Sequence, residues 1–92
     1  ADILAKYPET SIQIEGHTDD VPIKTDRYPS NWDLSVDRAA SVVKYILDNS
    51  NLPPERLAAV GWGEYHPQVP NRTKEDRGQN RRVDIVVVPR RK

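Results

Sequence analysis

The sequence predicts an α/β (α+β) two-layer sandwich, in which a mixed β-sheet carries helices packed on one face. Segments typical of strands and helices alternate along the 92 residues, which favours helices packed on a single sheet. The chain is also long enough for only one compact core, since domains usually contain about 100–150 residues. We therefore expect a single domain over residues 1–92, with a βαβαβ order of elements.

Residues 1–8 are typical of the end of a helix, because their apolar side chains have helical spacing and Pro8 follows. No capping residue precedes Ala1, so we expect the chain to be an excerpt that begins inside the first helix. No apolar run approaches the roughly 18 residues of a membrane span, but in an excerpt this says nothing about the parent protein. Residues 11–15 then alternate apolar and polar side chains, which predicts a half-buried strand.

The main helix is predicted over residues 31–49. Ser30 can cap its start, Asp33 lies three residues later, and Pro53 follows its end. Its apolar residues fall on one wide face of the helical wheel, which indicates packing against the sheet. They are Val36, Ala39, Ala40, Val42, Val43, Ile46 and Leu47.

Two further strands and a short helix are predicted after the main helix. Residues 56–60 predict a strand that Gly61 closes, and Thr73 can cap a short helix that runs through Gln79. Residues 83–88 are almost continuously apolar. We therefore expect the last strand to be central in the sheet or buried on both faces.

Composition excludes several kinds of function. The chain contains no cysteine, which excludes disulfides, thiolate metal sites and cysteine nucleophiles. Its net charge is zero, but the charge is unevenly distributed: 11 acidic and 6 basic residues lie up to Asn71, against 3 acidic and 8 basic residues beyond it. Because this is not a uniform basic surface, we expect no nucleic-acid partner.

Neither a metal site nor a catalytic site is expected. His17 and His66 lie about 50 residues apart, and no spacing of metal ligands in the chain is diagnostic. A hydrolase needs a nucleophile, a base and oxyanion donors in one place. Ser35 with His17 and Asp19 is the one conceivable trio, and nothing in the pattern places the histidine correctly. We therefore expect no catalytic residue, no metal and no cofactor.

One group of polar residues indicates a binding site. Asn31, Ser35 and Arg38 share one side of the predicted helix, in the first two turns, where free backbone N–H groups favour an anion. Thr18 and Asp19 follow the first strand, and the end of that strand meets the loop leading into the helix. Asp19 can therefore approach Arg38.

Two interpretations of Asp19 and Arg38 remain open from the pattern alone. One is a salt bridge that fixes the loop to the helix, which is the commoner arrangement at such a spacing. The other is a site for a zwitterion, in which Asp19 binds an ammonium group and Arg38 binds a carboxylate bidentately.

Several separate motifs resemble the OmpA-like peptidoglycan-binding domain, and they extend over nearly the whole chain. They are Gly16-His17-Thr18-Asp19, Asn31-Trp32-Asp33-Leu34-Ser35-Val36-Asp37-Arg38-Ala39, Gly61-Trp62-Gly63-Glu64 and Asn80-Arg81-Arg82-Val83. Within that family, residues 20–23 and 28–35 are similar to flagellar stator proteins of the MotB type.

The resemblance implies binding to the diaminopimelate of the peptidoglycan stem peptide. Asp19 matches the residue that receives the amino group, and Arg38 matches the residue that receives the carboxylate. The other positions that line the family's pocket are matched by Thr18, Asn31, Leu34 and Ser35. Family members usually begin with a further strand, which this sequence lacks, and their loop after the aspartate is often shorter.

The resemblance further implies a non-catalytic anchor that holds a flagellar motor stator to the cell wall. This places the domain in the periplasm as part of a cytoplasmic-membrane protein, and it implies a homodimer, a membrane segment and a stator partner subunit in the parent. One alternative is an outer-membrane porin tail or a Pal-like lipoprotein of the same family, associated with the outer membrane. Another is a protein-interaction module with a purely structural Asp19–Arg38 pair.

Overall fold

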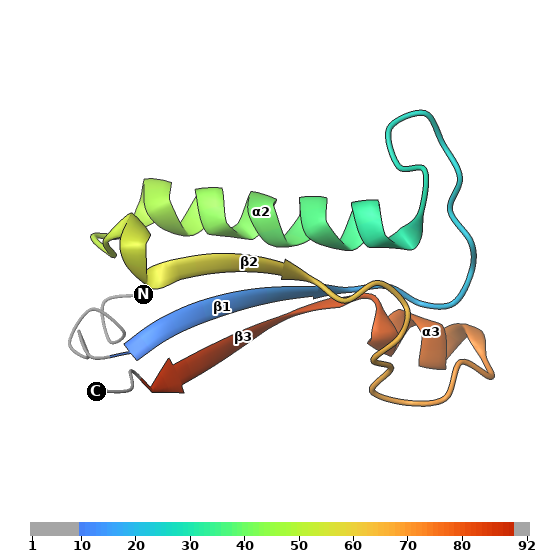
Figure 1. Cartoon of the computed structure of the whole chain (residues 1–92). Helices are drawn as coiled ribbons and strands as arrows, with labels where there is room; N and C mark the ends of the chain where they lie inside the picture. Colours follow the sequence, from blue (N-terminus) through green and yellow to red (C-terminus); the bar gives the residue numbers. More distant parts are fainter. Residues whose placement is uncertain (1–9, 90–92) are drawn as a thin grey trace.

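A three-stranded mixed sheet with a long helix across one face forms the domain (Figure 1). The computed structural model describes residues 10–89. The sheet has the order β2-β1-β3, in which β2 runs parallel to β1 and β3 runs antiparallel to it. The strands are β1 (Thr10–His17), β2 (Leu57–Gly61) and β3 (Arg82–Pro89). This arrangement confirms the predicted fold class.

The long helix α2 (Asn31–Asn49) has the predicted bounds, because its capping signals are local. The Ser30 hydroxyl accepts a hydrogen bond from the Asp33 N–H and donates one to the Asp33 carboxylate, as a capping residue does. The short helix α3 (Lys74–Asn80) begins after Thr73, which was predicted to cap it. No helix within residues 10–89 is both long and apolar enough to cross a membrane.

The core lies between α2 and strands β1 and β2. Ile12 and Ile14 of the central strand are fully buried, as is Ala39 on the helix. Partly buried side chains complete the core around them, and they are Val42, Val43, Ile46, Leu57 and Val83. The apolar face predicted for the helix is therefore the face that packs on the sheet. Its first member, Val36, lies beyond the core and is 48% exposed.

The prediction for the last strand was wrong. Among the strands of residues 10–89, β3 lies at an edge of the sheet and β1 is the central strand. Ile85 and Val87 are 57% and 45% exposed because, in the described part of the chain, α2 lies over β1 and β2 (Figure 1). A short 3-10 turn, Pro54–Arg56, also delays the start of β2 to Leu57. The helix predicted in residues 1–8 lies outside the described residues.

Candidate functional site

Two glycines let the start of α2 lie directly on the sheet. Gly16 of β1 and Gly61 of β2 are paired across the parallel strands. A Cβ atom on Gly16 would stand 2.1 Å from the backbone oxygen of Ser35, and one on Gly61 would stand 2.3 Å from Val36 Cγ2. Both distances are shorter than any real contact, so only glycine permits this close approach.

The loops that follow β1 and β2 are joined to each other and to the helix. The Thr18 N–H donates to the Gly63 carbonyl at 2.9 Å, and the Trp62 N–H donates to the Gly16 carbonyl at 3.0 Å. Ser35 is fully buried, and its hydroxyl accepts a hydrogen bond from the Gly63 N–H at 3.0 Å. The carboxyl ends of the two parallel strands and the first turns of α2 therefore form one rigid unit.

A cavity of about 400 Å³ opens beside this unit. It is lined by five of the six residues predicted for the site: Thr18, Asp19, Asn31, Leu34 and Arg38. The sixth, Ser35, is buried and supports the neighbouring turn instead of lining the cavity. The other lining residues are Val21, Pro22, Ile23 and Arg81. The long loop after Asp19 thus supplies an apolar wall.

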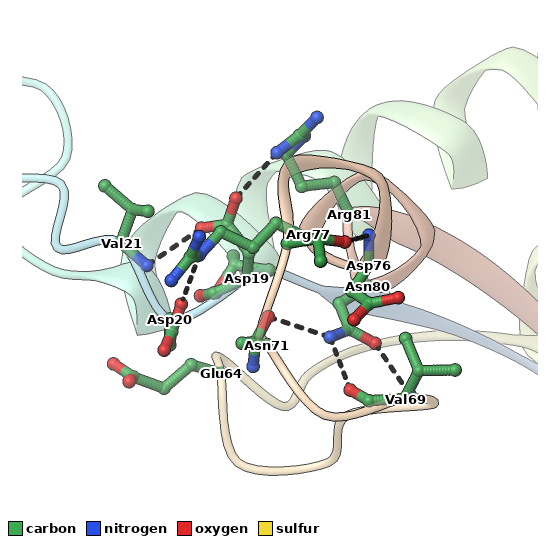
Figure 2. Close-up of polar contacts among 12 residues, drawn as sticks. Asp19, Asp20, Val21, Glu64, Val69, Asn71, Asp76, Arg77, Asn80 and Arg81 are labelled. Carbon is green, nitrogen blue, oxygen red and sulfur yellow. Dashed lines mark hydrogen bonds and ion pairs between the residues drawn. The ribbon is translucent and has the colours of Figure 1, made fainter.

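Asp19 pairs with Arg81 instead of Arg38. One carboxylate oxygen accepts from Arg81 Nη1 at 2.7 Å, and the other accepts from the Val21 N–H at 3.0 Å (Figure 2). Only 11% of the Asp19 side chain is exposed. Among residues 10–89 there is no Asp19–Arg38 ion pair, so the structural salt bridge considered for these two residues is not the one that forms.

Arg38 keeps its guanidinium unpaired in the described part of the chain. It makes no hydrogen bond and no ion pair with any residue of 10–89, although it is half-buried. It also lines a second cavity of about 310 Å³, together with Arg81, Arg82 and Val83. A half-buried guanidinium without a carboxylate partner is a strong site for an anion, because its five donors suit a planar oxyanion.

Asn31 holds the loop after β1 against the helix. Its side-chain amide donates to the carbonyl of Asp19 at 3.3 Å, to the carbonyl of Val21 at 3.2 Å and to Glu64 Oε1 at 3.4 Å. The Thr18 hydroxyl donates to the same Asp19 carbonyl at 2.8 Å. Both residues therefore fix the backbone that presents the Asp19 carboxylate.

The short helix α3 reinforces the site from the other side. Arg77 pairs with Asp20 at 3.0 Å, which ties α3 to the loop beside Asp19 (Figure 2). Asn80 is fully buried, and its amide bonds to Val69 and Asn71 in the loop that precedes α3. Arg81 follows directly, so this network sets the position of the guanidinium that meets Asp19.

Sequence reasoning missed Arg81 as the partner of Asp19. Its neighbour Arg82 also pairs with a carboxylate, that of Asp84 at 3.1 Å. The missing signal was the direction of β3. Because β3 is antiparallel to β1, its first residues lie beside the last residues of β1, with Arg82 opposite His17.

His17, the last residue of β1, is buried without a hydrogen bond to any residue of 10–89. It is 3% exposed, its Nε2 lies 3.4 Å from Asp84 Oδ2, and neither ring nitrogen is hydrogen-bonded to a described residue. Burial and the Arg82 guanidinium lower the pKa of His17, against the opposing effect of Asp84 and Glu15. The imidazole is therefore held in its neutral form.

Acidification should destabilise the domain through His17. Its pKa is lower in the folded protein than the 6.5 of the free side chain, so the unfolded chain binds more protons once the pH falls below about 6.5. The stability that the neutral ring contributes is complete above that pH and is lost below it. Between pH 7 and pH 5 we expect melting temperatures to fall more steeply for wild type than for His17→Gln. Identical slopes for wild type and His17→Gln would contradict the prediction.

In residues 10–89 no three histidine or carboxylate side chains come together as candidate metal ligands. His66 packs instead on Trp62, with ring centroids 4.4 Å apart. The chemistry of the site is thus that of charged hydrogen bonds: a buried carboxylate and a free guanidinium on one cavity. Such a pair can recognise a ligand that carries both an ammonium and a carboxylate group.

Comparisons with known proteins agree on one relationship. The family model described as OmpA family matches residues 1–81. Motility protein B of Bacillus subtilis is 41% identical over 90 residues, which are 98% of this chain and 34% of that protein. The chain therefore spans about a third of the length of this curated relative.

Solved structures show the same likeness. The periplasmic domain of Helicobacter pylori MotB superposes with a TM-score of 0.84 at 31% identity, over 96% of this chain and 54% of that one. The cell wall anchor of the T6SS from Pseudomonas aeruginosa superposes with a TM-score of 0.81 at 37% identity, over 98% of this chain and 61% of that one.

Proposed function

This chain belongs to the OmpA family, and from that premise we propose that it is a non-catalytic peptidoglycan-binding domain. The observation that carries the proposal is the cavity with Asp19 and Arg38 on its wall. Asp19 is held in place by two hydrogen bonds, and Arg38 has no partner among residues 10–89. The cavity therefore presents a ligand with the Asp19 carboxylate, which is paired with Arg81, and with the unpaired Arg38 guanidinium.

The ligand that fits these charges is the free end of a diaminopimelate residue in the stem peptide. That end carries an ammonium and a carboxylate on the same carbon atom. The Asp19 carboxylate already accepts two hydrogen bonds, and its remaining lone pairs would accept hydrogen bonds from the ammonium group. Arg38 would bind the carboxylate of the ligand. A lysine in the same position carries the ammonium alone, so it would leave Arg38 unused.

The parent protein is proposed to be a stator subunit of the MotB type, which this domain anchors to the cell wall from the periplasm. The likeness to Motility protein B and to a cell wall anchor supports this assignment. Because the chain spans about a third of that relative, the membrane segment, the stator partner subunit and the homodimer belong to the proposal for the whole protein.

Co-sedimentation with purified sacculi tests the function. Wild type should pellet with sacculi of the diaminopimelate type, should be released by free diaminopimelate, and should pellet less with sacculi of the lysine type. Asp19→Asn should weaken binding by about tenfold to a hundredfold, since a charged hydrogen bond contributes about 1.5–3 kcal/mol. Asparagine keeps an oxygen for the Val21 N–H, so the loop is disturbed little.

Thermal melts of the same proteins distinguish the remaining interpretation. If Asp19→Asn melts earlier than wild type but pellets equally well, the carboxylate serves the fold through Arg81 alone. The proposed site would then be wrong, whereas a wild type that fails to pellet at all would make the domain an interaction module.

A further inference from the structure

A pair of exposed aromatic rings lies beside the proposed peptide site. Trp32, in the first turn of α2, stacks on Tyr65 with ring centroids 5.2 Å apart and 29° between the ring planes. The two residues are 47% and 61% exposed. Large aromatic side chains contribute most when they are buried, so a stacked pair left in water is available to a ligand.

The turn beneath these rings is shaped to hold them there. Gly63 has φ of +63°, a conformation that other residues rarely adopt. A Cβ at this position would lie 3.3 Å from the Trp32 ring and 3.5 Å from the Tyr65 ring. The glycine therefore lets both rings rest on the turn, and the buried hydroxyl of Ser35 fixes that turn from below.

Trp32 also lines a cavity of about 430 Å³, together with the apolar Val36 and Ala40 and with four polar or charged residues. Tyr28 donates a hydrogen bond to Asp37 at 2.7 Å, and the Arg27 guanidinium lies over the Tyr28 ring at 5.2 Å. Asp33 contributes a second carboxylate to the same cavity. Both signs of charge are present beside an aromatic face, which suits a neutral ligand rich in hydroxyl groups better than an ion.

This aromatic cavity and the Asp19 cavity lie on the two flanks of the start of α2, since their linings take different sides of the helix. Trp32 follows Asn31 directly in α2, and Asn31 lines the Asp19 cavity. A ligand that reaches across the start of the helix can therefore occupy both. In peptidoglycan the stem peptide is joined to a sugar of the glycan strand. Each residue of an extended peptide adds at most about 3.5 Å to the distance between that sugar and the diaminopimelate.

We propose that the cavity lined by Trp32, Tyr28 and Asp37 binds a pyranose ring of the glycan strand. The C–H face of the sugar packs on the indole ring, while its hydroxyl groups bond to Asp33, Asp37 and Arg27. This assignment rests on the proposed function for the source of the glycan. It divides recognition of the wall between two cavities, one for the peptide and one for the sugar.

Two soluble probes separate the cavities in an NMR titration. The probes are chitotetraose, an uncharged N-acetylated glycan without peptide, and free diaminopimelate. Chitotetraose should shift the Trp32 indole N–H signal in wild type and in Arg38→Ala. In Trp32→Ala, chitotetraose should no longer shift the signals of the other residues that line the cavity. Diaminopimelate should bind Trp32→Ala normally and should fail to bind Arg38→Ala.

Sacculi provide the quantitative readout. Trp32→Ala should weaken co-sedimentation by about threefold to tenfold, the range expected for one aromatic contact. Tyr45→Ala is the matched control, because Tyr45 is another exposed aromatic residue farther along α2, at 67%. Trp32→Phe keeps an aromatic ring at this position and should bind sacculi better than Trp32→Ala. This comparison shows whether weaker binding by Trp32→Ala comes from the lost ring or from a folding defect.

The outcomes distinguish this inference from the function on which it rests. If wild type pellets with sacculi but chitotetraose leaves the Trp32 signal unmoved, the sugar cavity is wrong and the peptide site stands. If chitotetraose binds at Trp32 but neither sacculi nor diaminopimelate bind, the sugar site stands and the proposed peptide site fails. Equal sacculus binding by Trp32→Ala and Tyr45→Ala would also overturn the sugar cavity.

Discussion

Arg38→Ala should lower the affinity for diaminopimelate-type sacculi by about tenfold to a hundredfold and leave the stability of the domain unchanged. The guanidinium would lose charged hydrogen bonds to the ligand carboxylate worth about 1.5–3 kcal/mol. It has no hydrogen bond or ion pair in the described part of the chain to lose on the protein side. The affinity follows from a sacculus binding isotherm, and the stability follows from a thermal melt.

Two further variants sharpen the Arg38 prediction. Arg38→Lys keeps the charge but loses the forked geometry, so its affinity should lie between those of wild type and Arg38→Ala. Arg72→Ala removes an exposed arginine that lines neither cavity beside Arg38, and it should bind as wild type does. Wild-type affinity in Arg38→Ala would show that the cavity is not the wall-binding site.

Gly16→Ala should destabilise the domain by about 3 kcal/mol, at the upper end of what overpacking usually costs. The added methyl group would stand 2.1 Å from the Ser35 backbone oxygen and 3.0 Å from its carbonyl carbon. Backbone atoms cannot relieve the clash by changing rotamer as a side chain can, so α2 must move away from β1. For a domain of this size, the melting temperature should fall by more than about 10 °C.

A second glycine gives the control for this substitution. Gly78 lies in α3, and a Cβ there would meet only the end of the Arg81 side chain, at 3.4 Å. Alanine is favoured over glycine within a helix by up to about 1 kcal/mol, so Gly78→Ala should be neutral or slightly stabilising. Denaturant unfolding measures both changes. A Gly16→Ala variant as stable as wild type would mean that the helix does not rest on the sheet as described.

The elements that the sequence predicted well are those with local signals. Ser30, Asp33 and Pro53 mark both ends of α2 within a few residues, so its bounds were correct. The meeting of Asp19 and Arg38 on one cavity is local in the same sense. It follows from a strand, a loop and a helix that are consecutive in the chain.

The features that the sequence did not predict depend on contacts between distant segments. The Asp19–Arg81 pair joins residues 62 positions apart and depends on the antiparallel direction of β3. The apolar composition of residues 83–88 indicated burial but could not say which strands would be neighbours. No local signal placed Trp32 at the surface, where it is 47% exposed and stacks on Tyr65.

The central position of β1 has a mechanical consequence. β1 begins at Thr10 and ends at His17, and Asp19 on the cavity wall follows two residues later. A tension applied between the start of β1 and a ligand held at Asp19 would run along the strand. The hydrogen bonds to β2 and β3 lie across that direction. They would be loaded together in shear on both sides, instead of being peeled apart one at a time, and such a geometry resists pulling forces.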